Sequence, residues 1–359
     1  MRGAFVDQGG LFSYLLPEAR VPKNHPLRKV RELVRVVLDD LDRCFGRLYA
    51  SEGRPSIPPE QLLSALLLQV FYGIRSERQL MEQLDYNLLY RWFVGLSPDD
   101  PVWDPTTFTK NRDRLQSGEV VAKFMSKLLN HPQVKPLLSD EHFSVDGTLI
   151  EAWASQKSFR PRDGGGDDDG GANFHGQKRK NDTHASTTDP DSRLYRKATG
   201  REARLSYMGH ATMENRHGLA VAGLVTHATG TAERHASETM LKSKAKATGG
   251  RITVGEDKAY DTAEHVAKLR AMSVTPHVAQ YNSAGAKGRQ SAIDRRTTRH
   301  DGYGMSQSRR AMIECIFGWG KQHGTMRKTK HRGIARVAAD FMLNLIAYNL
   351  IRIPKLLAA

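Results

Sequence analysis

The sequence predicts an α/β fold preceded by an all-helical N-terminal domain. Up to about residue 135 the chain shows only short helical patterns separated by turn residues. Strand-like runs appear after Pro136: three come in succession, and helices then alternate with two more. That order of elements is typical of an α/β domain. We therefore expect a helical domain over residues 1–135 and an α/β domain over residues 136–359.

The helices expected in the first domain follow capping residues or prolines and end at glycine or loop residues. They cover residues 27–50, 60–73, 77–87, 88–94 and 108–117. Ser76 is placed to cap the helix that begins at residue 77, with Gln79 as its capping-box partner. Thr106 or Thr107 is expected to cap the last helix. The sequence predicts a set of short helices without a heptad repeat.

Five runs in the second part have the β-branched and apolar character of strands. They cover residues 142–146, 205–213, 219–228, 251–256 and 274–280. Helices are expected at 232–247 and 261–272. The first three strands follow one another without an intervening helix, which favours antiparallel pairing among them.

A long polar insert separates the first two strands. Residues of about 157–203 are rich in Gly, Asp, Ser and Thr, and few of them could be buried, so a flexible loop is expected. The run Asp167–Asp169 lies in this insert. A glycine-flanked charge run of this kind is more typical of a solvated loop than of a metal site.

The charge of the chain indicates a polyanionic partner. The formal net charge is +15 and the isoelectric point is about 9.8, which points most simply to nucleic acid, with a merely soluble basic protein as the alternative. Two cysteines far apart argue against a disulfide framework and a zinc knuckle, and they fit a reducing compartment.

Nothing in the sequence predicts export or membrane insertion. The N-terminal residues lack the apolar segment and cleavage site of a signal peptide. The most apolar stretch, residues 337–353, is interrupted by Asp340, Asn344 and Asn349. We therefore expect a cytoplasmic protein with no membrane segment.

Two acids stand at the ends of expected strands. Asp146 ends the first strand and is followed by Gly147, which allows close approach of a substrate. Asp257 follows the fourth strand, at the edge where open α/β sheets build their sites. Strand alternation sends Glu256 and Asp257 to opposite faces, so only one of them can join Asp146. Taken singly, an Asp-Gly turn and an acid in a loop have ordinary structural explanations.

A third acid, Glu314, lies in the sequence RRAMIECIFGWGK, residues 309–321, which predicts one helix. Arg310, Glu314 and Lys321 would fall within a stripe about 40° wide, with Gln307 near it. The opposite side carries Met312, Ile316 and Trp319 and would pack on a sheet. A surface helix with an incidental Arg–Glu pair is the alternative.

Together the three acids suggest phosphoryl transfer. Asp146, Asp257 and Glu314 would form a hard oxygen site suited to magnesium or manganese. Two such ions could activate a water or a 3′-hydroxyl and stabilise the leaving oxygen of a phosphodiester. Arg310 and Lys321 would hold neighbouring phosphates.

These motifs resemble those of a known family. SVDGTLIEAWAS, GEDKAYDT and RRAMIECIFGWGK are similar to the three acidic motifs of bacterial insertion-sequence transposases of the DDE type, groups four and five. The third motif of that family is Tyr-x2-Arg-x3-Glu-x6-Lys, and Arg310, Glu314 and Lys321 match its spacing, whereas Gln307 stands at the Tyr position. Glu256 and Ala259 also depart from the pattern. The resemblance extends from about residue 55 to the C-terminus.

The resemblance implies an RNase H-like mixed sheet with flanking helices. It also implies a transposase that binds the terminal inverted repeats of its element, cleaves DNA at the ends and transfers the 3′-hydroxyl to target DNA. The expected catalytic residues and ligands of two Mg²⁺ or Mn²⁺ ions are Asp146, Asp257 and Glu314. The residues expected to bind DNA phosphates are Arg310, Lys321, Gln307 and Lys258. Joining two element ends implies a dimer or larger assembly on double-stranded DNA, in the bacterial cytoplasm and associated with the nucleoid.

The helical domain is the expected reader of DNA sequence. Residues 76–95 followed by 106–116 resemble a helix-turn-helix, and its candidate recognition residues are Lys110, Asn111, Arg112 and Arg114. A helical bundle that only packs or dimerises is the alternative. The basic stretch from Arg295 to Arg336 is expected to be a phosphate track.

Two other functions would use the same residues. An RNase H-like nuclease or resolvase would cut DNA without joining strands. A non-catalytic repressor derived from a transposase would bind DNA only, and its acids would be dispensable.

Overall fold

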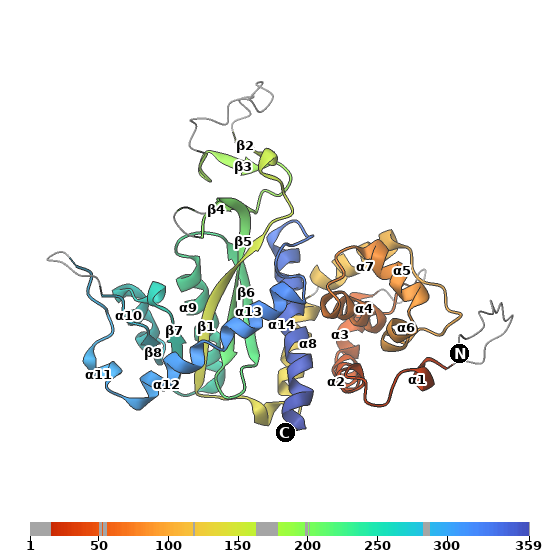
Figure 1. Cartoon of the computed structure of the whole chain (residues 1–359), viewed down its shortest axis with the longest axis horizontal. Coiled ribbons are helices and arrows are strands. Elements are labelled where there is room, and N and C mark those ends of the chain that lie inside the picture. The colour runs from red at the N-terminus through yellow and green to blue at the C-terminus, as the bar shows by residue number, and fades with distance from the viewer. Residues whose placement is uncertain are drawn as a thin grey trace, which may run out of the picture.

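The computed structural model describes residues 16–49, 52, 56–117, 119–162, 179–197, 200, 202–282 and 288–358. Figure 1 shows a group of N-terminal helices beside a twisted mixed sheet, with a long C-terminal helix between them. Further helices cover the sheet, so the predicted α/β class is confirmed.

The described N-terminal part is helical, as predicted. Its helices are α1 (Pro17–Arg20), α2 (Leu27–Asp39), α3 (Asp42–Leu48), α4 (Pro59–Phe71), α5 (Glu77–Tyr86), α6 (Leu88–Val94), α7 (Pro105–Ser117) and α8 (Val120–Asn130). The Ser76 side chain caps α5 by accepting the N–H of Gln79. The predicted cap of α7 is wrong, because the helix begins earlier and Asp104 Oδ1 accepts the N–H groups of Thr106 and Thr107.

The main sheet has six strands among the described residues. They are β1 (His142–Glu151), β4 (Arg193–Tyr195), β5 (Arg204–Glu214), β6 (Ala220–His227), β7 (Ile252–Glu256) and β8 (Val274–Val278). The long strands lie in the order β6–β5–β1–β7–β8, and β4 adds to β5. Pairing is antiparallel from β6 to β1 and parallel from β1 to β8, so the sheet is mixed, as expected.

Helices cover both faces of this sheet. They are α9 (Ala232–Thr248), α10 (Ala263–Ala271), α11 (Arg295–Thr298), α12 (Asp301–Arg310), α13 (Ile313–Gln322) and α14 (Ile334–Leu357). On one face, Phe143 and Val145 of β1 pack with Met240 and Leu241 of α9. The other face packs against α13 and α14.

The first strand is longer than predicted, and this determines where the site lies. β1 continues to Glu151 because β5 pairs with it over its whole length. Its parallel pairing with β7 stops at Ser144, opposite Gly255. Farther along, Glu151 bridges to Lys328. Among the described residues, this edge of β1 therefore has no partner strand over 146–150, directly beyond the end of β7.

The described ends of the polar insert are ordered, which corrects the expectation of a flexible loop. β2 (Phe159–Pro161) pairs with β3 (His184–Ser186). Asp189 is buried, and its Oδ1 accepts the hydroxyl of Tyr207 at 2.6 Å and the N–H of Gly333 at 3.1 Å. These long-range contacts cannot be read from a polar local sequence. The run Asp167–Asp169 lies outside the described residues.

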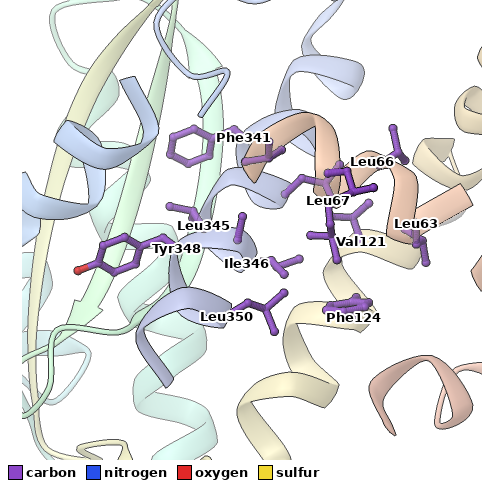
Figure 2. Close-up of a cluster of buried hydrophobic side chains, with 14 of the residues drawn as sticks. Leu63, Leu66, Leu67, Val121, Phe124, Phe341, Leu345, Ile346, Tyr348 and Leu350 are labelled. Atoms are coloured by element: carbon purple, nitrogen blue, oxygen red, sulfur yellow. The ribbon is translucent and has the colours of Figure 1, made fainter. Parts of the chain in front are cut away.

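The C-terminal helix joins the two parts of the molecule. Figure 2 shows Leu67 of α4 and Phe124 of α8 facing Ile346 and Leu350 of α14. The other side of α14 packs on the sheet, where Phe341 and Leu345 lie against Gly209 and Gly223 of β5 and β6. One continuous apolar cluster therefore runs from the N-terminal helices through α14 into the sheet.

Three polar residues of α14, Asp340, Asn344 and Asn349, are buried and hydrogen-bonded. Asn349 donates to the carbonyl of Ala220 at 2.7 Å and accepts its N–H at 2.9 Å. Thr325 donates to Asp340 and accepts from Asn344. By length and composition, α14 is the one helix in the described part of the chain that could cross a membrane, but most of its apolar window is buried inside the protein, as in a core helix.

Candidate active site

Asp146 is the centre of the candidate site. It lies on β1, on the face opposite Phe143 and Val145, and its Oδ1 accepts the N–H of Gly147 at 2.7 Å. The pKa of Asp146 is raised to about 7, chiefly by burial; the Gly147 hydrogen bond lowers it, and the nearby carboxylates of Glu314, Asp257 and Glu233 raise it. Four carboxylates from four separate segments thus lie near one another.

Asp257 directly follows β7 and caps the short 3-10 helix η3 (Lys258–Tyr260) by accepting the N–H of Ala259 at 2.6 Å. The preceding residue, Glu256, is fully buried in another direction, where it accepts hydrogen bonds from Ser237 and from His265 Nε2. The prediction that only one acid of this pair could join Asp146 is therefore confirmed.

The predicted single helix around Glu314 is wrong. α12 ends at Arg310 and α13 begins at Ile313, with a turn between them. The two helices pack against different partners: Ser306 fastens α12 to the sheet between the rings of His142 and His277, whereas α13 packs into the core with α14. Glu314 is exposed in the first turn of α13, and its charge still acts on Asp146.

The basic residues of the third motif differ in their surroundings. Lys321 lies on α13 near Glu314, and burial together with Lys197 and Arg327 lowers its pKa. Arg310 ends α12, and its Nε is buried without a hydrogen-bond partner in the described part of the protein. These two cations are on separate helices, so the predicted continuous stripe does not exist.

The other two phosphate candidates are also placed. Gln307 donates its amide N–H to the carbonyl of His277 at 2.5 Å, so it fastens α12 to the end of β8. Lys258 is exposed beside Asp257, with its Nζ 5.9 Å from the ring centroid of Tyr281. Of this pair, only Lys258 presents a free charge to solvent.

The donor set suits a hard divalent cation. A cation near Asp146 would offset the mutual repulsion of these carboxylates, and carboxylate oxygens are the ligands that Mg²⁺ and Mn²⁺ prefer. Over the described residues, no three His, Cys, Asp or Glu side chains already surround one point at ligand distance. The suitability of this site for a divalent cation is therefore inferred from the carboxylate chemistry of its residues and from the effect of their charges on one another.

Glu233 was not predicted from the sequence. It lies in the first turn of α9, and it acts on the pKa of Asp146. In the sequence it is one acid of an ordinary amphipathic helix. The only available signal was its place at the start of the helix that follows the third strand.

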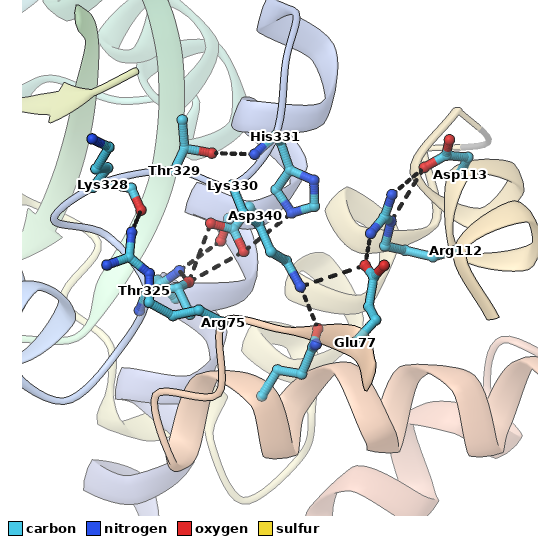
Figure 3. Close-up of polar contacts among 12 residues, drawn as sticks. Arg75, Glu77, Arg112, Asp113, Thr325, Lys328, Thr329, Lys330, His331 and Asp340 are labelled. Atoms are coloured by element: carbon cyan, nitrogen blue, oxygen red, sulfur yellow. Dashed lines mark hydrogen bonds and ion pairs between the residues drawn. The ribbon is translucent and has the colours of Figure 1, made fainter. Parts of the chain in front are cut away.

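Two of the four predicted recognition residues are buried in the protein, which corrects that prediction. Arg112 pairs with Glu77 of α5 and with Asp113 at 2.8 Å (Figure 3), and Asn111 donates to the carbonyl of Thr107 at 2.9 Å. This side of α7 packs on the rest of the chain, so neither residue can reach a base edge. Lys110 and Arg114 are exposed, with Arg114 5.1 Å from the ring centroid of Tyr49.

Part of the predicted phosphate track is also internal. Lys330 donates to Gln69 at 3.0 Å and pairs with Glu77 at 3.5 Å, and burial lowers its pKa to about 8 (Figure 3). Arg75 donates to the carbonyl of Lys328 at 2.6 Å. These contacts fasten the 328–330 segment to the N-terminal helices, whereas Arg327 and Arg332 remain exposed.

Two family models match the sequence. The model described as "Transposase DDE domain" matches residues 138–350, and the model described as "Transposase domain (DUF772)" matches residues 16–114. The chain belongs to the transposase DDE domain family. This transposase carries all three motif acids within the larger match. The resemblance to DDE transposases is thereby confirmed, and the matches are consistent with an insertion-sequence origin.

Solved structures of other transposases show distant similarity. A piggyBac transposase synaptic complex with hairpin DNA has 11% identity and a TM-score of 0.38, with 91% of this chain and 74% of that chain covered. A Mos1 transposase paired-end complex with Mn has 14% identity and a TM-score of 0.20, with 94% and 93% covered. Such low scores carry no argument about the site. No curated protein matches the transposase.

Proposed function

We propose that this transposase binds the terminal inverted repeats of its element, cleaves the phosphodiesters at the ends and joins the freed 3′-hydroxyl to target DNA. The proposal is supported by the position of Asp146 at the open edge of β1, where the charges of Glu314 and Asp257 add to burial in raising its pKa. Three acids remote in sequence gather at an open strand edge. Such an arrangement is costly unless a cation is bound there.

Asp146, Asp257 and Glu314 would hold the divalent cations, Mg²⁺ or Mn²⁺, two at a site. Bound there, the ions supply Lewis-acid stabilisation of both the attacking and the leaving oxygen. Lys321 and the unpaired Nε–H of Arg310 would hold phosphate oxygens beside the acids. Lys258 would add a third positive charge at the Asp257 side. Gln307 would act mainly by fastening α12, because one N–H of its amide is donated to the carbonyl of His277.

Recognition of the element ends is assigned to the N-terminal part, residues 1–135, and chemistry to residues 136–359. Lys110 and Arg114 on α7 are the exposed cations of the proposed helix-turn-helix. Since two ends must be joined, the active form would be a dimer or larger on DNA. Action on chromosomal and element DNA places the transposase in the cytoplasm, with the nucleoid.

The experiment is a strand-transfer assay with the purified full chain. Its DNA substrate is taken from the inverted repeats that flank the gene, in uncut and precleaved forms with a 3′-hydroxyl. Asp257→Asn and Glu314→Gln are expected to lower both cleavage and joining at least about 100-fold, since a few kcal/mol of transition-state stabilisation are lost. Glu264→Gln, which removes an exposed carboxylate on α10, should leave both steps unchanged.

Each alternative gives a different result. Cleavage without joining of precleaved ends would identify a nuclease. A biological effect that survives Asp146→Asn would identify a repressor. Either result would contradict the proposed function.

A further inference from the structure

Glu233 approaches the site from the face of the sheet opposite Glu314. α9 packs on the face that carries Phe143 and Val145, and strand alternation places Gly147 on that same face. A β-carbon built on Gly147 would lie only 2.8 Å from Glu233 Oε1. The carboxylate of Glu233, a half-buried residue, is therefore turned onto the backbone of β1, next to Asp146.

In the part of the chain that the structure describes, this carboxylate makes no hydrogen bond or ion pair. Burial and the charge of Asp257 raise the pKa of Glu233, while the more weakly acting charges of Arg234 and Lys197 lower it. An acid in the first turn of a helix is stabilised by the helix dipole. The dipole explains an acid at this position, but it does not explain why the side chain points at Gly147.

Two buried polar groups nearby are also unpaired. His210 faces Gly147 across the β1–β5 ladder and is fully buried, and its Nε2 lies 2.8 Å from Thr226 Oγ1. Its Nδ1 has no partner and would lie 3.2 Å from the same built β-carbon. The buried hydroxyl of Tyr260 is unpaired too, and after burial the charge of Glu233 is the largest cause of its raised pKa.

Unpaired buried polar groups are rare and costly. Two of them, His210 Nδ1 and Tyr260 Oη, lie around Asp146 and Gly147, beside the half-buried Glu233. The unpaired edge of β1 beyond Ser144 lets side chains from both faces of the sheet reach the same point. A polar ligand at that point would give all three groups a partner.

We propose that Glu233 is a fourth carboxylate ligand of the divalent-cation site, reaching it from the α9 side while Glu314 reaches it from the α13 side. This inference rests on the proposed function, since it concerns the same cations as Asp146 and Asp257. Water on a hydrated cation would supply the hydrogen-bond partners that His210 Nδ1 and Tyr260 lack. Gly147 is then required because any side chain there would displace the Glu233 carboxylate.

The experiment measures Mn²⁺ binding to the full chain without DNA, by calorimetry and by electron paramagnetic resonance. Glu233→Gln is expected to weaken Mn²⁺ binding by about tenfold or more. Glu233→Asp keeps the charge but withdraws the oxygens by one methylene, so a ligand role predicts weaker binding for this variant as well. Glu264→Gln is the matched control and should bind as the wild type does.

The outcomes separate this inference from the proposed function. If Glu233→Asp binds Mn²⁺ like the wild type, Glu233 acts only through its charge and the inference is wrong. If Asp257→Asn loses binding and both Glu233 variants keep it, the inference alone is overturned. If the wild type binds no better than Asp257→Asn, the proposed metal site itself fails. Unfolding in EDTA verifies that each variant is folded.

Discussion

At neutral pH, ionisation of Asp146 lowers the free energy of unfolding of the metal-free protein. Burial of its carboxylate, with a smaller contribution from three neighbouring acids, raises its pKa to about 7 from a usual value near 3.8. The folded chain therefore holds a proton on Asp146 in a pH range where the unfolded chain has released it. Stability from this residue is complete below pH 4 and is lost as the pH rises through 7.

Asp146→Asn is accordingly expected to stabilise the metal-free protein at high pH. Between pH 5 and pH 8 in EDTA, the free energy of unfolding of the variant minus that of the wild type should rise by a few kcal/mol, since one pKa unit corresponds to about 1.4 kcal/mol. Urea unfolding at several pH values measures this difference. Asp99→Asn, at an exposed loop position, is the control, and a flat difference for Asp146→Asn would contradict the raised pKa.

At this scale the sequence revealed the acids but not their surroundings. Asp146, Asp257 and Glu314 were recognisable because each sits at a strand end or on a patterned helix. Glu233 was invisible because its approach to Gly147 depends on how α9 crosses the sheet. Asn111 and Arg112 were misassigned because exposure on α7 is decided by α5, far away in the sequence.

The helix α7 illustrates how one element divides its residues between structure and exposed surface. Arg112 is enclosed by Glu77 and Asp113, whereas Lys110 and Arg114 point outward. Any role of α7 in DNA binding must therefore come from its outer side.

Lys110→Ala is expected to weaken binding of the element end by about tenfold, the scale of one lost base contact, without changing the unfolding temperature. Arg112→Ala should instead lower the free energy of unfolding by about 3 kcal/mol, because it leaves Glu77 without its main ion pair. Electrophoretic mobility shifts and thermal unfolding of both variants separate the two effects. If both variants lost the same DNA affinity and kept the same stability, the assignment of DNA binding to the outer side of α7 and of a structural role to Arg112 would be wrong.

The buried polar residues of α14 stabilise the protein through their hydrogen bonds. Asn349→Leu makes the helix more apolar, yet it should destabilise the protein by about 3 kcal/mol, because the buried N–H and carbonyl of Ala220 lose their partners. Chemical denaturation measures the loss. Ala335→Leu, at an exposed position of the same helix, should change stability by less than about 0.5 kcal/mol. Equal stability of the two variants would show that the hydrogen bonds of Asn349 are unimportant.

Element order was predictable, whereas element boundaries were not. Alternation and caps identified the strands and most helices of the α/β part. The break between α12 and α13 was missed, because it arises where one helix docks on the sheet through Ser306 and the next docks in the core. The extension of β1 to Glu151 depends on its pairing with β5, which local sequence does not show.

For the whole molecule, the net charge of +15 predicts strongly salt-dependent DNA binding. If six to ten phosphates are contacted, affinity for a duplex should fall by about 10³-fold or more between 50 and 200 mM salt. Lys321→Gln should reduce the slope of log affinity against log salt by about one. The matched control is Lys246→Gln, which removes an exposed positive charge near the C-terminal end of α9. If both variants give the same slope, Lys321 does not contact a DNA phosphate.

The shared core around α14 has a consequence for how the protein is made. Residues 334–357 are synthesised after the N-terminal helices and after the sheet. Both of those parts pack their apolar sides against the helix that these residues form. Neither part can complete its interior until that helix has left the ribosome. A frameshift late in the reading frame would thus leave two unfinished halves with exposed apolar faces, which is the condition that recruits chaperones and proteases.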